Sequence, residues 1–277
     1  MKIYLDIGHG GGDSGATANG YVEKDLNLRF GMMVRDGFLR RGQIVFCSRE
    51  TDVNNFGTTA DDAIIGSAKL ANSLGAELFL SLHFNSASSD TATGVQLIYS
   101  KNDSKGRALC DLIAKKYKEA GQPLNAIYTR VSDNGLDYYG VIRLTNMQAI
   151  IVESAFVTTL QDIKKFDDDK FCKGVAEALC DAVTEFFGLN DGNDKPGEEE
   201  TMYYRVRKSW DDPKSQLDAY TVLENAIKKA DENPGYYVFD EGGKVVYPSA
   251  GGTDDYKAMY LDLKARVDEA VRILTEK

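Results

Sequence analysis

The chain has 277 residues, 43% of them hydrophobic, and a formal net charge of −10 at pH 7. This length provides for one sizeable core and one further small domain. No basic stripe stands out, which argues against a nucleic-acid partner. No segment approaches the roughly 20 consecutive apolar residues of a membrane-spanning helix, so we expect no membrane insertion.

The N-terminal segment and the cysteines indicate where the protein is made. The opening residues MKIYLDIGHG lack the apolar region of a signal peptide. The four cysteines are scattered without a CxxC pair, which predicts free thiols in a reducing compartment. We therefore expect synthesis in the cytoplasm, with any release by a route other than general secretion.

Residues 1–189 predict one α/β domain. Strands are expected at 3–7, 43–49, 77–83, 94–99 and 149–156, and helices at 22–41, 58–74, 104–120 and 168–187. The alternation of strands with helices predicts a largely parallel sheet that is covered on both faces. The strand at 149–156 starts with an apolar run, so we expect it to be central.

The chain after residue 189 predicts a linker and a small α+β domain. Residues 190–201 contain no apolar side chain and form the linker. The small domain, residues 202–277, is expected to contain a strand at 203–210, a helix at 213–231, a hairpin of strands 236–239 and 244–247, and a terminal helix at 251–277.

The small domain is a candidate for self-association. About fifty residues before the terminal helix are marginal for independent folding. The terminal helix has a heptad pattern, formed by Tyr256, Tyr260, Leu263, Val267, Ala270 and Leu274. The alternative is that it packs on its own chain. Met202 follows glycine and glutamate residues whose codons can spell a ribosome-binding sequence, so an internally initiated fragment from Met202 is a further candidate partner.

The only two histidines, His9 and His83, each follow or end a predicted strand. The carboxyl ends of strands line the ligand crevice of α/β sheets, so the two imidazoles can share a metal there. The alternative for each histidine is an ordinary hydrogen-bonded side chain. Glu23 lies at the start of a predicted helix, where the helix dipole alone favours an acidic residue. Beside two histidines it becomes the natural third ligand, and this set leaves a fourth zinc position open to water.

Glu153 interrupts an apolar strand between Val152 and Ser154. A carboxylate in such a place is costly unless it is paired or lies at the mouth of a site. It is therefore either a general base whose pKa is raised by its apolar setting or a strand-end glutamate exposed to water.

Taken in order, the motifs of residues 1–188 resemble those of the N-acetylmuramoyl-L-alanine amidase 3 family. They are Asp6-Ile7-Gly8-His9-Gly10-Gly11, Glu23, Ser48-Arg49-Glu50-Thr51-Asp52, Ser81-Leu82-His83-Phe84-Asn85, Val141-Ile142-Arg143 and Ile151-Val152-Glu153-Ser154-Ala155-Phe156. Two departures, Gln148 for a frequent proline and Ala155 for a glycine, affect only local strand shape.

The resemblance implies a twisted, mostly parallel sheet and one Zn²⁺ held by His9, Glu23 and His83. It also implies that Glu153 is catalytic and that the substrate is peptidoglycan, cut between N-acetylmuramic acid and L-alanine. Asn85 and Arg143 are the candidate substrate-binding residues. A zinc peptidase that cuts stem-peptide bonds and a non-catalytic wall-binding protein are the alternatives.

The C-terminal domain resembles the domain behind the amidases of phage endolysins from Gram-positive hosts, which implies cell-wall targeting. Tyr203 and Tyr237 are candidate wall-binding residues, unless these aromatic side chains simply form the small core. With no signal peptide, the resemblance favours an endolysin that reaches the wall through a holin-type pore or after lysis. A host autolysin or a sporulation or germination amidase is the alternative.

Overall fold

The computed structural model describes residues 1–57, 59–189, 204–220, 223–240, 243 and 245–248. Its contacts divide the chain into two compact units, an N-terminal unit with the elements up to Phe186 and a C-terminal unit with those from Tyr204 on. The predicted linker, Tyr203, Met202 and the predicted terminal helix lie outside the described residues. None of the described helices is both long enough and apolar enough to cross a bilayer.

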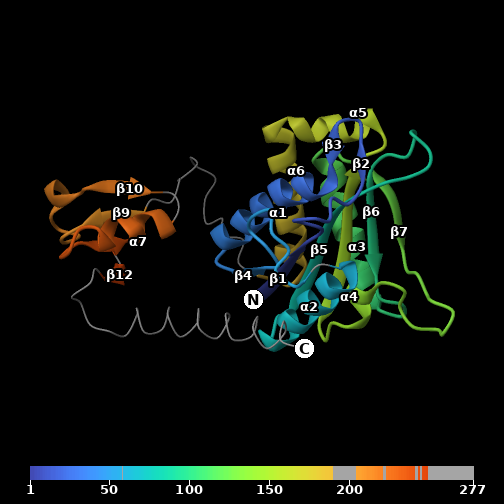
Figure 1. The fold of residues 1–277 in the computed structure, drawn as a ribbon, viewed down its shortest axis with the longest axis horizontal. Helices are drawn as coiled ribbons and strands as arrows, with labels where there is room; N and C mark the ends of the chain where they lie inside the picture. The colour runs from blue at the N-terminus through green and yellow to red at the C-terminus, as the bar shows by residue number, and fades with distance from the viewer. Residues whose placement is uncertain (58, 190–203, 221–222, 241–242, 244, 249–277) are drawn as a thin grey trace. The chain divides into compact units, whose positions relative to one another are not determined.

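A six-stranded sheet forms the centre of the N-terminal unit (Figure 1). Its strands, in spatial order, are β4 Ile44–Cys47, β1 Lys2–Ile7, β5 Leu78–Asn85, β8 Gln148–Phe156, β6 Val95–Tyr99 and β7 Leu124–Tyr128. All neighbouring strands are parallel except β6 and β8. The predicted mostly parallel sheet is therefore confirmed, with β8 at an internal position.

Helices cover both faces of this sheet (Figure 1). The larger layer contains α1 Glu23–Arg40, α3 Ser104–Glu119 and α6 Asp169–Phe186, and the smaller one contains α2 Ala60–Ser73 and α4 Gly140–Arg143. A short hairpin of β2 Thr17–Ala18 and β3 Tyr21–Val22 precedes α1, while α5 Leu160–Ile163 and the 3₁₀ helix η1 Lys164–Asp167 connect β8 to α6.

The alternation of side chains along each strand gives the sheet two apolar faces, one under each helical layer. On β1, Ile3, Leu5 and Ile7 belong to the core under the larger helical layer, whereas Tyr4 belongs to the core under α2 and α4. Successive residues of a strand point to opposite faces, so a strand that is apolar at every position is buried on both sides. His83 of β5 and Glu153 of β8 lie on the face that α2 and α4 cover, because each is an even number of residues away from a side chain of that core, Phe79 or Ile151.

Local signals set the ends of the helices. Thr59 accepts a hydrogen bond from the Asp62 amide at 3.1 Å, and the Asp62 carboxylate accepts one from the Thr59 amide, a capping box that starts α2. Two residues after α2, Gly75 has a φ of 63°, a conformation that glycine adopts without strain.

The four predicted helices of the N-terminal unit agree with the structure to within two residues at each end.

The strand β7 and the one-turn helix α4 were absent from the sequence prediction. β7 carries three exposed or partly exposed residues before Ile127 and lies at the sheet edge, so it has no continuous apolar signal. All four cysteines are free thiols, as expected.

The C-terminal unit contains one four-stranded antiparallel sheet with a single described helix, α7 Leu223–Asp231. The sheet order is β10 Asp218–Tyr220, β9 Tyr204–Arg207, β11 Tyr237–Phe239 and β12 Val245–Pro248. The predicted hairpin is confirmed as β11 and β12. The predicted helix at 213–231 is wrong in its first half, which forms the 3₁₀ helix η2 Pro213–Ser215 and β10. Pairing of β10 with β9 overrides the local helical pattern there.

Candidate metal centre and catalytic cleft

His9 lies in the turn that follows β1 and has a φ of 62°, which is uncommon for a residue with a side chain. The preceding Gly8 carbonyl accepts hydrogen bonds from Asn27 Nδ2 at 2.9 Å and from Arg49 Nη2 at 3.1 Å. His9 Nδ1 lies 2.9 Å from Asp13 Oδ2. These contacts fix the turn and orient the imidazole so that Nε2 remains available for a ligand.

Glu23 is the first residue of α1 and is buried, with 5% of its surface exposed. Its Oε2 accepts a hydrogen bond from the Ala16 amide at 2.8 Å, and its Oε1 accepts one from the Phe84 amide at 3.3 Å. The carboxylate is thereby held between the residue that precedes β2 and the end of β5. Glu23 therefore both begins α1, as predicted, and has a fixed position beside the sheet.

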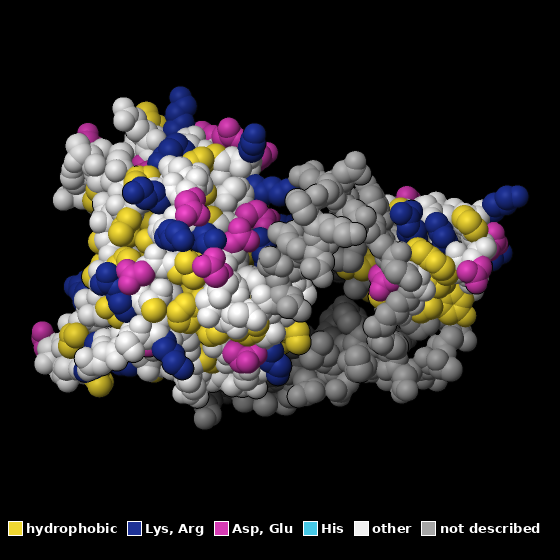
Figure 2. All heavy atoms as spheres, turned by 180° about the vertical axis from the view of Figure 1, so that it is seen from behind, with side chains coloured by type: hydrophobic (Ala, Val, Ile, Leu, Met, Phe, Trp, Pro, Cys, Tyr) yellow, Lys and Arg dark blue, Asp and Glu magenta, His cyan; other side chains and the backbone are white. Residues whose placement is uncertain are grey.

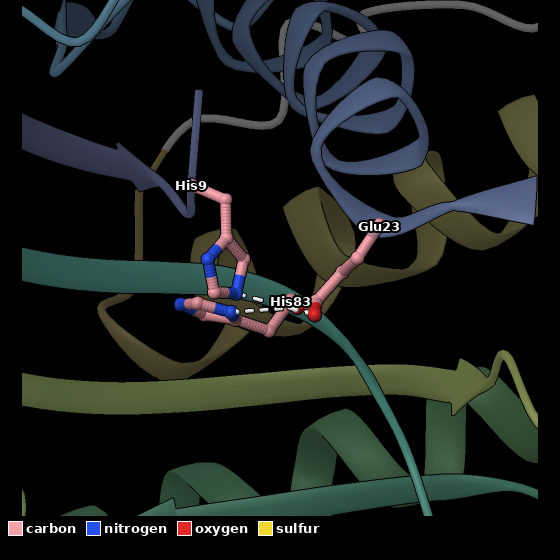
Figure 3. A group of neighbouring side chains, drawn as sticks. All are labelled: His9, Glu23 and His83. Atoms are coloured by element: carbon pink, nitrogen blue, oxygen red, sulfur yellow. Dashed lines mark hydrogen bonds and ion pairs between the residues drawn. The ribbon is translucent and has the colours of Figure 1, made fainter. Parts of the chain in front are cut away.

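The three predicted ligands converge at the carboxyl edge of the sheet (Figure 3). Glu23 Oε2 lies 3.2 Å from His9 Nε2, and Glu23 Oε1 lies 2.9 Å from His83 Nδ1. One ligand atom from each residue lies within 4.8 Å of the other two. The imidazole rings are almost perpendicular, with centroids 5.0 Å apart. Two imidazoles and one carboxylate are the donor set of many hydrolytic zinc sites.

Two glycines leave the space that this arrangement requires. A Cβ at Gly8 would lie 2.1 Å from His83 Cε1. A Cβ at Gly15, which has a φ of 62°, would lie 2.6 Å from both Glu23 Oε2 and His9 Cδ2. The nearest atoms that a Cβ at either glycine would meet belong to the three ligands, so the glycines provide the space in which these ligand side chains come together.

The electrostatics of the triad also suit a cation. Burial favours the neutral form of Glu23, but the hydrogen bonds from His83 and His9 outweigh it and hold the pKa of this carboxyl well below its usual range. Burial lowers the pKa of His83, but the hydrogen bond to Glu23 and the charges of Glu153 and Glu23 raise it to about 9. The site therefore concentrates negative charge around two imidazoles, and a bound cation would replace their protons.

Glu153 lies beside the triad on β8, with His83 of β5 and Gln96 of β6 as its neighbours in the two adjoining strands. The side chain is partly buried, and its Oε2 is buried without a hydrogen-bond partner among the described residues. Burial raises the pKa of Glu153 to about 7, although the charges of His83 and His9 act in the opposite direction. An unpartnered carboxylate oxygen with a pKa near neutrality is what a general base requires.

Asn85, a predicted substrate-binding residue, is engaged elsewhere. A register shift between His83 and Asn85 interrupts the pairing of β5 with β8. Asn85 Nδ2 donates to Gln96 Oε1 at 2.8 Å, and Gln96 Nε2 donates to Asn125 Oδ1 at 2.8 Å. This chain of amides occupies Gln96, which explains why Glu153 obtains no hydrogen bond from its neighbour.

A pocket of about 230 Å³ opens beside the triad and Glu153. Its floor includes Asp6 and Ser81, whose side chains are hydrogen bonded to each other at 2.7 Å. Its walls are mostly apolar and come from the loop before α2, from α2 and from α4; they include Phe56, Ile64 and Val141. The pocket can therefore exclude water around a reacting group while His9, His83 and Glu153 line one side of it.

Arg143 does not line this pocket, although its neighbours Gly140 and Val141 do. The Arg143 side chain is exposed and lines a second, neighbouring groove along α2 and α4. The structure thus brings together His9, Glu23, His83 and Glu153, but not the two predicted substrate-binding residues.

Arg49 is a positioning residue for which the sequence suggested no role beyond its place in the Ser48–Asp52 motif. It is only 2% exposed and donates to four backbone carbonyls, those of Ile7, Gly8, Lys24 and Thr51. The first two lie directly before His9, and Lys24 directly follows Glu23. One buried guanidinium therefore ties the segments that carry two of the three ligands.

The aromatic residues of the C-terminal unit divide between its core and its surface. Tyr247 is buried, and Tyr204 and Tyr236 pack on the same small core, as the alternative interpretation expects. Tyr237 is partly buried and lies with its ring centroid 6.3 Å from that of Phe239. Tyr237 therefore remains the described candidate for a wall contact.

Comparisons with known proteins give a consistent result. Residues 3–185 match the family model described as N-acetylmuramoyl-L-alanine amidase. The endolysin of Bacillus phage SPP1 is 29% identical over 250 residues, which cover 84% of this chain and 83% of the endolysin. The N-acetylmuramoyl-L-alanine amidase CwlM of Bacillus licheniformis is 30% identical over 193 residues, which cover 69% of this chain and 70% of that protein.

Solved structures agree with these sequence matches. The catalytic domain of CwlV, an N-acetylmuramoyl-L-alanine amidase from Bacillus (Paenibacillus) polymyxa var. colistinus, superposes with a TM-score of 0.57 at 26% identity. The match covers 68% of this chain and 98% of that domain.

Proposed function

This chain belongs to the N-acetylmuramoyl-L-alanine amidase family, and we propose that it is a zinc hydrolase that serves a phage as an endolysin. As an amidase of this family it acts on peptidoglycan. The proposed bond is the amide between N-acetylmuramic acid and L-alanine, and the proposed zinc ligands are His9, Glu23 and His83.

The observation that carries the proposal is the position of the unpartnered Glu153 Oε2 beside the triad. Three ligand atoms within 4.8 Å of one another can hold a metal and leave one position open. Zinc, when bound there, supplies a Lewis acid that polarises the scissile carbonyl and lowers the pKa of water toward ~7. The apolar walls of the neighbouring pocket strengthen such electrostatic effects because they exclude solvent.

The roles of the protein side chains follow from their contacts. Glu153 Oε2 accepts a proton from the attacking water and then delivers it to the departing alanine amine. Asp13 orients the His9 ring through its contact with Nδ1. Arg49 donates hydrogen bonds to the carbonyl before His9 and to the carbonyl after Glu23, and so fixes the backbone next to these two ligands. No serine or cysteine nucleophile is required.

The role as an endolysin rests on the length of the match to the SPP1 endolysin. An alignment that covers 84% of the chain extends beyond residue 194 and into the C-terminal unit, not only across the catalytic fold. We therefore assign the catalytic domain to residues 1–189, the linker to 190–201 and a wall-targeting domain to 202–277. Action on the wall follows release through a holin-type pore or after lysis.

Metal removal and product analysis test the chemistry. Chelation should abolish the release of stem peptides from purified peptidoglycan, and one equivalent of Zn²⁺ should restore it. Mass spectrometry should find stem peptides that begin with a free L-alanine amine. A new amine at another residue indicates a stem-peptide peptidase, and wall binding without any product indicates a non-catalytic protein.

Lysis from inside the cell tests the biological role. Expression of the full chain in a Gram-positive host should lyse the culture only when a holin is co-expressed, with Glu153→Gln as the inactive control. Lysis without a holin would instead favour a secreted host autolysin. For wall targeting, Tyr237→Ala should weaken sedimentation with purified walls at an unchanged melting temperature, whereas a lowered melting temperature would assign Tyr237 to the core.

A further inference from the structure

A second groove adjoins the catalytic pocket. It has a volume of about 690 Å³ and runs along α2 and α4, which lie side by side in the fold (Figure 1). Ile64, Tyr139 and Gly140 line both the groove and the pocket. The two hollows are therefore adjacent, and the groove lies next to the place where a ligand beside Glu153 would leave the pocket.

Exposed apolar side chains gather along this path. Ile65, Tyr138 and Leu144 line the groove and are 42%, 47% and 39% exposed. Val53, which lines the catalytic pocket, is 50% exposed. Scattered exposed apolar residues are ordinary, but a contiguous set beside a catalytic pocket is typical of a binding surface.

Two cations line the same groove, although the whole chain has a net charge of −10. The Lys69 side chain is exposed and makes no hydrogen bond or ion pair with any described residue. Arg143 uses only Nη1 within the described chain, donating to the carbonyls of Asp137 at 2.6 Å and Tyr138 at 3.0 Å. Its other guanidinium nitrogens therefore remain available to a ligand. Asp61 is the only acidic side chain among the described residues of the groove.

We propose that this groove binds the peptide stem of the substrate beyond its first alanine, with Lys69 and Arg143 pairing with the stem carboxylates. This inference rests on the proposed function. The scissile amide joins a hydroxyl-rich glycan to a peptide that carries carboxylates and apolar side chains. Only the peptide matches a groove that combines exposed apolar residues with two cations.

The length of the groove and the side-chain contacts of its two cations fit this assignment. Asp61 and Lys69 both line the groove and are eight residues apart on α2, which is about 12 Å at a rise of 1.5 Å per residue. This length matches roughly three or four residues of an extended peptide, which advances about 3.3 Å per residue. Arg143 is pre-oriented by its two backbone contacts, whereas Lys69 can adapt to the ligand. The predicted substrate contact of Arg143 is thereby placed on the peptide side, away from the metal ligands.

The test compares two soluble muramoyl pentapeptides that differ only in whether the stem carboxylates are free or amidated. The full wild-type chain should cleave the free acid with a kcat/KM about tenfold higher than that of the amide, mainly through a lower KM. Lys69→Met and Arg143→Met should each reduce this preference, and the double variant should abolish it. Arg107→Met, which removes an exposed arginine of α3, is the matched control and should keep the preference.

The outcomes separate this inference from the proposed function. A wild-type chain that cleaves both substrates equally, or a Lys69→Met Arg143→Met variant that keeps the preference, would overturn the groove assignment while leaving the amidase function intact. A wild-type chain that cleaves neither substrate at the muramoyl amide would overturn the proposed function itself. Because the Lys69 side chain makes no hydrogen bond or ion pair within the described chain, its substitution tests the groove even if Arg143→Met disturbs the loop at Asp137.

Discussion

Glu153→Gln should stabilise the metal-free protein at neutral pH while it abolishes activity. Burial raises the pKa of Glu153 from 4.5 to about 7. The carboxyl thus keeps its proton in the folded chain at pH values where the unfolded chain has released it. Gln has nearly the same shape and carries no titrating proton.

The difference in pKa sets the size and sign of the effect. Because the folded state binds the proton more tightly, the free energy of unfolding of the wild type falls as pH rises from 4.5 to 7, by about 3 kcal/mol in total. The Gln variant lacks this decrease. Its stability relative to the wild type should therefore rise by about 3 kcal/mol between pH 4 and pH 8.

Urea unfolding of the chelator-treated proteins at pH 4, 5.5 and 8 measures this change. Glu119→Gln, at an exposed position near the end of α3, is the matched control for replacing a glutamate. Activity of the zinc-loaded Glu153→Gln variant is measured in parallel on purified peptidoglycan. If the difference in the free energy of unfolding between wild type and Glu153→Gln stays constant across this pH range, the raised pKa of Glu153 is refuted. If the variant lyses walls at the wild-type rate, the role of Glu153 as the general base is refuted.

Three further predictions concern the metal site and the fold. Gly8→Ala should weaken zinc binding by about 100-fold, because its Cβ would collide with the His83 ring, whereas Gly12→Ala, with open space around its Cβ, should bind zinc normally in a chelator competition. His83→Ala should contain no zinc by elemental analysis and show no activity; one zinc per chain would disprove the ligand assignment. Asp162→Ala should lower the free energy of unfolding by about 3–5 kcal/mol, since the buried carboxylate binds Lys165 and two backbone amides, and a loss under 1 kcal/mol would contradict that role.

The sequence by itself determined the layered α/β fold and the four residues of the proposed centre. Apolar periods of two and of about 3.6 residues are local properties, so five of the six strands of the central sheet and the four long helices of the N-terminal unit could be predicted. The two histidines could be predicted as site residues because the carboxyl ends of neighbouring strands meet at one edge. Glu153 could be predicted because a carboxylate that interrupts an apolar strand is costly unless it lies at a site. Glu23 followed from its helix-start position and the need for a third ligand.

Only the tertiary structure decided how residues distant in sequence combine. Asn85, predicted to bind the substrate, donates a hydrogen bond to Gln96 after a register shift that follows His83, and its contact with the substrate stays a prediction. Arg49 ties the ligand segments through carbonyls up to 42 positions away, a role that no local pattern reveals. The residues at 218–220 form an edge strand because β9 is available to pair with them. In each case long-range hydrogen bonding, which the local sequence does not encode, overrides or completes the local preference.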